Sequence, residues 1–194
     1  MNSEFRQMVI DGDEVGLEEA LDNECPHFFV VDWREDDADI IKYCAECLGL
    51  ASLTADWEGE ELFITFEGRK VRVPLKMDVA DRHITVCTLN DLLNPKYEVR
   101  FLVFSHGSDT LGFAALSVAD WQLLEKANSA VVAENFIDPR RLPNLMTELT
   151  EEKLPPDARA RFQRMLERNK RRCSTSRNGR PEQILGSWSW VLGI

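Results

Sequence analysis

The chain has 194 residues, of which 44 % are hydrophobic and 29 % charged, so it can bury a core and is not disordered throughout. No apolar run approaches the roughly 18 residues that span a bilayer, and the first residues lack the pattern of a secretory signal. We therefore expect a cytoplasmic protein. Charge is unevenly distributed, because residues 1–138 have a net charge of −17 and residues 139–194 one of +6. Fields of this size steer charged partners.

Hydrophobic periodicity predicts alternating helices and strands up to residue 138. In chain order we expect a helix around residues 15–21, a buried strand at 27–33, a helix from Asp36 to Gly49, strands at 53–57, 62–66 and 71–75, a helix ending at Asn94-Pro95, strands at 97–104 and 111–116, a helix from Ser117 and a second short helix at 131–136. Consecutive hairpins predict an α+β fold with a mixed or mainly antiparallel sheet and helices packed on one face.

The pattern and the charge both change after Asp138. We therefore predict two parts, an acidic α+β domain at 1–138 and a basic helical tail at 139–194 with a Trp-rich C-terminal segment. Within the tail we expect a short helix at 142–149, a basic helix from Pro155-Pro156 to residue 172 and a loop at 174–180. The segment 184–194 is interpreted as a strand that completes a sheet or as a peptide that fills an apolar groove.

The basic helix has two interpretations. Its arginines suit contact with nucleic acid, and they also suit docking on the acidic body of the same chain. The sequence pI of about 4.8 argues against a dedicated nucleic-acid binder, because the acidic body would repel phosphate.

The cysteines raise the question of a metal site. Cys44 and Cys47 form a C-x-x-C, and Cys25 and His27 lie upstream, so four soft ligands occur in the order that suits zinc. Both cysteines of the C-x-x-C also fall on the apolar stripe of their predicted helix. We therefore predict buried, reduced thiols, and no metal or cofactor.

No catalytic motif is present. His83 and His106 lie in short polar segments that contain the residue types of a hydrolase triad, but no G-x-S-x-G, phosphate-binding loop or H-E-x-x-H accompanies them. We interpret these histidines as turn residues and predict no catalytic residues. The dense carboxylates around residues 32–39 lack the spacing of a calcium loop, so they predict a solvated acidic face.

In size and composition the chain is similar to the small acidic proteins with which bacteria neutralise toxins. The hypothesis is an immunity protein that occludes a toxin with a basic active-site cleft, with no nucleic-acid or membrane partner. The predicted binding residues are Asp32, Glu35, Asp36, Asp37 and Asp39, with Glu58, Glu60 and Glu61 as a second patch. One alternative is an enzyme whose site is assembled from Cys44, Cys47, Asp81 and His83; another is an adaptor that binds through the basic tail.

Overall fold

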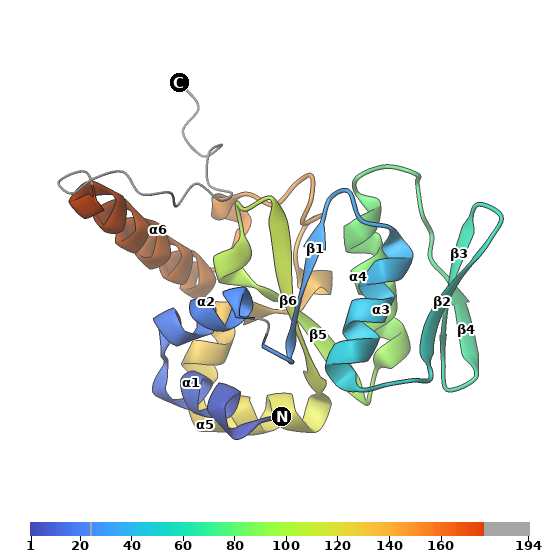
Figure 1. Ribbon diagram of the computed structural model, residues 1–194, viewed down its shortest axis with the longest axis horizontal. Helices are drawn as coiled ribbons and strands as arrows, with labels where there is room; N and C mark the ends of the chain where they lie inside the picture. Colours follow the sequence, from blue (N-terminus) through green and yellow to red (C-terminus); the bar gives the residue numbers. More distant parts are fainter. Residues whose placement is uncertain (24, 177–194) are drawn as a thin grey trace.

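Two antiparallel sheets organise the computed structural model, which describes residues 1–23 and 25–176, with side chains as far as Arg171 (Figure 1). The larger sheet has the strand order β1 (Phe28–Asp32), β6 (Thr110–Ser117), β5 (Tyr97–Leu102) and β7 (Phe136–Ile137). The smaller sheet has the order β2 (Leu53–Glu58), β3 (Glu61–Phe66) and β4 (Arg69–Arg72). The α+β class and the antiparallel hairpins are confirmed.

Helices and sheets alternate in layers. The helices are α1 (Ser3–Asp11), α2 (Glu14–Asp22), α3 (Asp37–Leu48), α4 (Asp81–Leu93), α5 (Val118–Asn135) and α6 (Pro156–Ser176). α3 and α4 lie between the two sheets, while α1, α2 and α5 lie on the other side of the larger sheet (Figure 1). Short 3-10 turns occur at Val103–Ser105, Pro139–Arg141 and Glu151–Lys153.

Helices cover both faces of the larger sheet, and the reason is the composition of β6. This strand is buried from Leu111 to Leu116, so each of its faces needs a partner. On one face Phe113 stacks on Phe29, with ring centroids 5.4 Å apart. On the other face Arg100 lies over the ring of Trp121 from α5, at 4.2 Å. Among the described residues, the helices α3 and α4 pack on one face of the smaller sheet, as the hairpins predict (Figure 1).

The hairpin turn of the smaller sheet forms as predicted, but its third strand ends earlier than predicted. Glu67 and Gly68 have φ values of 49° and 76°, the left-handed conformations that a two-residue hairpin turn requires. β4 ends at Arg72, however, and does not reach Leu75. The N–H of Val73 still bonds to the carbonyl of Leu62, and the next residue, Pro74, has no N–H with which to continue the ladder.

Two expectations about helices are wrong. The helix α1 was not predicted, although Asn2 caps it by accepting a hydrogen bond from the N–H of Phe5. The segment 142–149 is not a helix. There the side chain of Asn144 accepts hydrogen bonds from the N–H groups of Met146 and Thr147, an arrangement that competes with helical bonds.

Two other elements differ at their ends. The strand expected at 97–104 ends at Leu102 and turns into the 3-10 segment Val103–Ser105. The two helices expected between Ser117 and residue 136 join as α5, which bends at Asn128. There the Asn128 amide donates to the carbonyl of Ile10, and its oxygen accepts from the N–H of Val131.

The basic helix α6 packs against α5 and against the 3-10 segment Val103–Ser105 that follows β5. Leu154, Phe162 and Met165 belong to the same buried cluster as the strands of the larger sheet. The domain boundary after residue 138 stays a prediction, but buried side chains from both sides of it share one core. The predicted segment 184–194 and residues 177–180 of the expected loop lie outside the described residues, and 174–176 end α6. No helix in the described part of the chain is long and apolar enough to cross a membrane.

Candidate protein-binding site

Exposed apolar side chains gather around one groove. Trp33, Trp57, Met77 and Val79 line it, and they are four of the seven large apolar side chains exposed in the described chain. The groove has a volume of about 400 Å³ and is completed by Asp36, Asp37, Leu75, Asp78, Asp81 and Arg82. We call it the indole groove. Scattered apolar residues on a surface need no explanation, but a cluster of this kind is typical of an interaction site.

A hydrogen bond from Trp57 fixes one wall of the indole groove. Asp36 is the N-cap of α3, and its Oδ1 accepts from the N–H of Ala38 at 2.8 Å. The same oxygen accepts from Nε1 of Trp57 at 2.9 Å. Because Trp57 belongs to β2, this bond ties the smaller sheet to the start of α3 and holds one indole edge-on beside a carboxylate.

The floor of the groove contains a buried carboxylate. Asp37 accepts hydrogen bonds from Oγ1 of Thr85 at 2.6 Å and from Nη1 of Arg82 at 3.1 Å. Burial raises the pKa of Asp37, and the Thr85 hydrogen bond and the Arg82 charge oppose that rise. Asp37 was expected on a solvated face; it is buried and joins α3 to α4 instead.

A second buried carboxylate positions Met77. Asp81, the first residue of α4, accepts the N–H groups of Lys76, Met77 and Asp78 at 2.8, 2.7 and 3.1 Å. These bonds hold Met77 at a φ of 63°, with 68 % of its surface exposed. An exposed methionine in a left-handed conformation requires such restraint. The loop therefore presents its apolar side chain to solvent in a fixed place.

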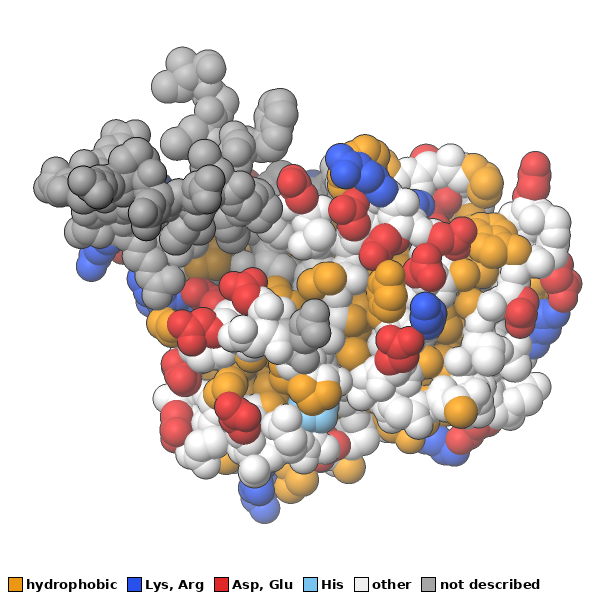
Figure 2. Space-filling model, in the orientation of Figure 1, with side chains coloured by type: hydrophobic (Ala, Val, Ile, Leu, Met, Phe, Trp, Pro, Cys, Tyr) orange, Lys and Arg blue, Asp and Glu red, His pale blue; other side chains and the backbone are white. Residues whose placement is uncertain are grey.

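The charge of the indole groove is predominantly negative. Four aspartates line it, against the single cation Arg82. Trp33 is 49 % exposed, and the guanidinium of Arg34 lies 4.6 Å from the centre of its ring. Figure 2 shows red and orange side chains intermingled over the upper part of the molecule, where β1, α3 and the smaller sheet meet. A surface of this composition favours a partner that is both basic and apolar.

The remaining predicted carboxylates of the first patch have local roles as well. Oδ1 of Asp32 accepts from the N–H of Arg34, and Oε2 of Glu35 accepts from the N–H of Asp32. Oε1 of Glu35 also accepts from the hydroxyl of Tyr43 at 3.1 Å. Asp39 lines a different groove, between α3 and β2. The structure thus brings Asp36 and Asp37 to the indole groove and leaves the other three beside it.

The second predicted patch is partly neutralised. Glu58 pairs with Lys70, and Glu61 pairs with Arg72. Glu60 lies exposed in the turn between β2 and β3. Lys70 also lies over the ring of Phe63, at 4.5 Å. Basic side chains of β4 therefore balance two of the three carboxylates, and this patch is less acidic than its own residues suggest.

Sequence reasoning missed the apolar part of the site. The sequence places Trp33 at the end of a predicted buried strand and indicates no role for Met77 and Val79. One signal was available: two apolar residues at positions 77 and 79 flank Asp78 after Pro74, where a loop and not a core element is expected. A run of charged residues is visible in a sequence, whereas the exposure of an apolar side chain is not.

The four zinc candidates do not converge. Nε2 of His27 accepts the N–H of Asn2 at 3.0 Å, and its ring lies against Phe5. The thiol of Cys47 donates to the carbonyl of Phe28 at 3.2 Å. Within the described chain, no group of three or more His, Cys, Asp and Glu side chains is arranged to hold a metal ion.

The residues of the enzyme alternative have contacts and pKa shifts that suit a structural role. Burial strongly raises the pKa of the Cys44 thiol and raises that of Cys47 to about 12. Asp81 holds the Met77 loop, as described above. Burial lowers the pKa of His83, whose Nε2 lies 3.5 Å from the sulfur of Cys87. The pKa of Cys87 is also raised by burial, to about 12, which is opposite to the shift that a nucleophilic thiolate requires.

Comparison with known protein families, with curated proteins and with solved structures finds no match for this chain.

Proposed function

We propose that this chain binds another protein through the indole groove and neutralises it, as a toxin immunity protein does. The observation that supports the proposal is the clustering of Trp33, Trp57, Met77 and Val79 around a groove lined by four aspartates. Tryptophan is among the residues that dominate binding energy at protein interfaces, and methionine adapts to irregular partner surfaces.

The chemistry of the groove defines the partner. A basic segment would meet Asp36 and Asp78, and an apolar side chain beside it would cover Trp33 and Met77. A toxin with a cationic active-site cleft, such as a nuclease, offers both features. Occlusion of such a cleft requires complementary shape and charge and no catalytic group on the inhibitor.

The adaptor alternative is less well supported. Arg161, Arg164 and Arg168 of the basic helix pair with Glu14, Glu18 and Glu134 of the same chain, so these arginines are engaged within the molecule. The enzyme alternative would need a thiolate or carboxylate free to react, and its candidates are the buried groups described above.

The test begins with site-specific cross-linking. The photoreactive residue p-benzoylphenylalanine replaces Trp33 in one variant and Leu123 in another, within cells that express the chain. Leu123 is the matched control, since it is 50 % exposed but lies on α5, away from the groove. We expect one protein to be cross-linked at the first position and not at the second.

Binding is then measured with that protein in purified form. Trp33→Ala should weaken the complex by about 2 kcal/mol or more, roughly 30-fold in Kd. Leu123→Ala should change the affinity by less than about twofold, since a residue outside the interface has no contact to lose. The association rate should fall as salt rises. Equal cross-linking at both positions, or a Kd unchanged by Trp33→Ala, would exclude the indole groove as the binding surface.

A further inference from the structure

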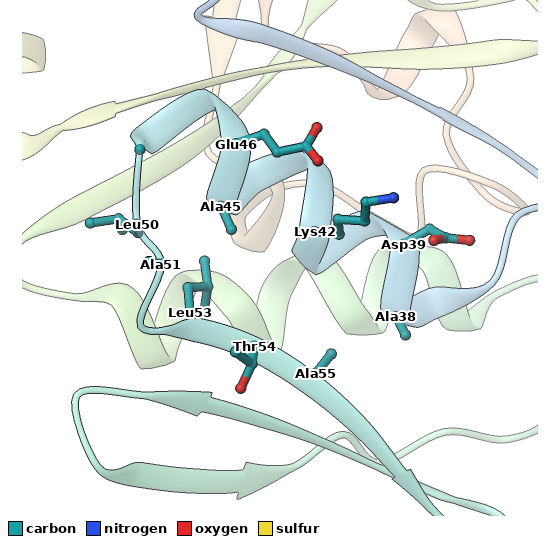
Figure 3. A pocket seen from close by; sticks show the side chains of 11 residues that line it. Ala38, Asp39, Lys42, Ala45, Glu46, Leu50, Ala51, Leu53, Thr54 and Ala55 are labelled. Atoms are coloured by element: carbon teal, nitrogen blue, oxygen red, sulfur yellow. The ribbon is translucent and has the colours of Figure 1, made fainter.

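A second groove runs between α3 and β2, on the other side of the bond between Trp57 and Asp36. It has a volume of about 640 Å³, and its lining includes Asp39, Lys42, Ala45, Glu46, Leu53 and Ala55. Figure 3 shows α3 running alongside β2, with Ala45 and Leu53 directed into the space between them and Lys42 nearer the rim. We call it the edge groove. Alanine and leucine side chains make up the apolar part of its walls.

The edge groove borders a strand edge whose hydrogen-bonding groups are open. β2 is an outer strand of the smaller sheet. A two-residue turn joins β2 to β3, so Glu58 and Glu61 form a hydrogen-bonded pair. Antiparallel bonding alternates along the strand, so Ala55 directs its N–H and C=O away from β3. The N–H of Leu53 follows the same alternation, since it bonds to the carbonyl of Leu50 and not to β3.

No partner for the outward groups of Ala55 and Trp57 occurs among the described residues. The edge of β1 is covered at both of its ends. On β1 the carbonyl of Phe28 accepts from the Cys47 thiol, and the N–H of Asp32 donates to Glu35. β4 is short and carries three basic side chains, which discourage pairing. The open edge of β2 therefore lies beside an apolar groove.

We infer that the edge groove takes up an extended peptide segment of another protein, which adds to β2 as an antiparallel strand. The segment's backbone would pair with Ala55 and Trp57, and alternate side chains would enter the space lined by Ala45 and Leu53. Strand addition of this kind takes affinity from the backbone and specificity from alternate side chains. β2 spans six residues, about 20 Å, so the matching segment has a similar length.

Charge distinguishes the occupant from a second copy of this chain. Asp39 and Glu46 stand at the rim against Lys42, and Asp56 follows on β2. A second copy would bring an edge with the same excess of carboxylates, and like charges across a strand pair are destabilising. A segment with a lysine or arginine at each end complements the groove instead.

The inference is independent of the proposed function, because it uses the backbone of Ala55 and Trp57, whereas the indole groove uses the side chain of Trp57. Strand addition at β2 can occur whether or not the indole groove binds a protein. The experiment therefore includes a variant of each groove, so that the failure of one proposal does not count against the other.

The probe is an acetylated, amidated peptide of sequence Lys-Val-Thr-Val-Thr-Val-Lys, titrated into the ¹⁵N-labelled full chain. We expect the amide signals of Ala55 and Trp57 to shift. Hydrogen exchange at Ala55 should slow by about tenfold or more at saturation, since its N–H becomes hydrogen-bonded. A peptide with glutamate at both ends should bind at least about fivefold more weakly, through repulsion at the rim.

Two substitutions separate backbone pairing from non-specific contact. Ala55→Pro removes an N–H that makes no bond within the sheet, so the fold is retained while affinity falls by about tenfold. Trp33→Ala, in the indole groove, should leave the peptide's Kd unchanged. The same loss should follow when the protein-facing amides of the peptide are N-methylated, a change that leaves the protein itself intact.

Three outcomes would overturn the inference. They are equal affinity of the probe for Ala55→Pro and wild type, equal affinity of the N-methylated and unmodified peptides, and an Ala55 amide already protected in the peptide-free chain. The last would mean that this chain, or a second copy of it, occupies the edge.

Discussion

Substitution of Arg161 by alanine should detach the basic helix from the body. Arg161 is fully buried, and its Nε donates to Oδ1 of Asn135 at 2.8 Å. Its Nη2 donates to Oε1 of Glu18 at 2.8 Å and to the carbonyl of Glu14 at 3.3 Å. The variant therefore leaves three acceptors, on α2 and α5, without this donor.

The size of the loss in unfolding free energy depends on which contacts the partners of Arg161 keep in the variant. Removal of one partner of a buried ion pair costs about 3–5 kcal/mol. Both glutamates keep Arg168, and each is about one-fifth exposed, so water reaches them in part. Nη1 of Arg161 also lacks a hydrogen bond in the folded protein, which reduces the loss. We expect the lower end of the range, a loss of about 3 kcal/mol in the free energy of unfolding.

Urea unfolding followed by circular dichroism measures this loss, and hydrogen exchange shows whether the amides of α6 lose protection first. Arg171→Ala is the control, because Arg171 is exposed and its pair with Glu167 lies on the helix surface. Its effect should stay within about 0.5 kcal/mol. A loss below 1 kcal/mol for Arg161→Ala, with α6 as protected as in the wild type, would refute the reasoning.

Three further predictions concern pH, thiols and the edge of β5. Burial acts to raise the pKa of Glu14, but hydrogen bonds from Arg168 and Arg164 outweigh burial and lower this pKa below 4.5. The ionised Glu14 should therefore stabilise the fold above pH 4.5, and this stabilisation should be lost as the pH falls through the lowered pKa. Urea unfolding of Glu14→Gln should accordingly approach wild-type stability at acid pH and not at pH 7. Cys44 should resist alkylation in the native protein and react on unfolding, as peptide mass spectrometry would show, because burial strongly raises the pKa of its thiol. Asn90→Ala should reduce the unfolding free energy by about 2–4 kcal/mol in urea titration, since its amide makes two 2.7 Å hydrogen bonds to the backbone of Val99; a loss under 1 kcal/mol would contradict this.

Local signals accounted for much of the fold. Gly49 ends α3 in the left-handed conformation, and Glu67-Gly68 forms the hairpin turn, as their residue types predict. The errors lie where a single side chain diverts the backbone. Asn144 replaces helical bonds after residue 142, and Asn128 bends α5 while bonding to Ile10, far away in the sequence. Such tertiary contacts leave no periodic pattern.

The candidate site was predictable in its charge and not in its shape. Asp36 and Asp37 do lie at the start of a helix, as their position before an apolar stripe indicates. Whether a carboxylate faces solvent or its neighbours depends on the packing of distant segments. Asp37 is buried because Arg82 and Thr85, on a helix 45 residues or more away, come to it. Trp33 and Met77 line the same groove for the same reason, through loops that sequence periodicity does not describe.

The bend at Asn128 has a consequence for the order in which the chain can assemble during synthesis. The carbonyl of Ile10, near the end of α1, holds Asn128, and the second half of α5 then carries Asn135 to Arg161. The first and last helices thus meet through α5, and contacts between residues so distant in sequence form slowly. On the ribosome, Glu14 and Glu18 lack their arginine partners until α6 has emerged. A nascent chain should therefore acquire its hairpins early and close around its two ends last, and loss of the C-terminal helix should leave α2 exposed.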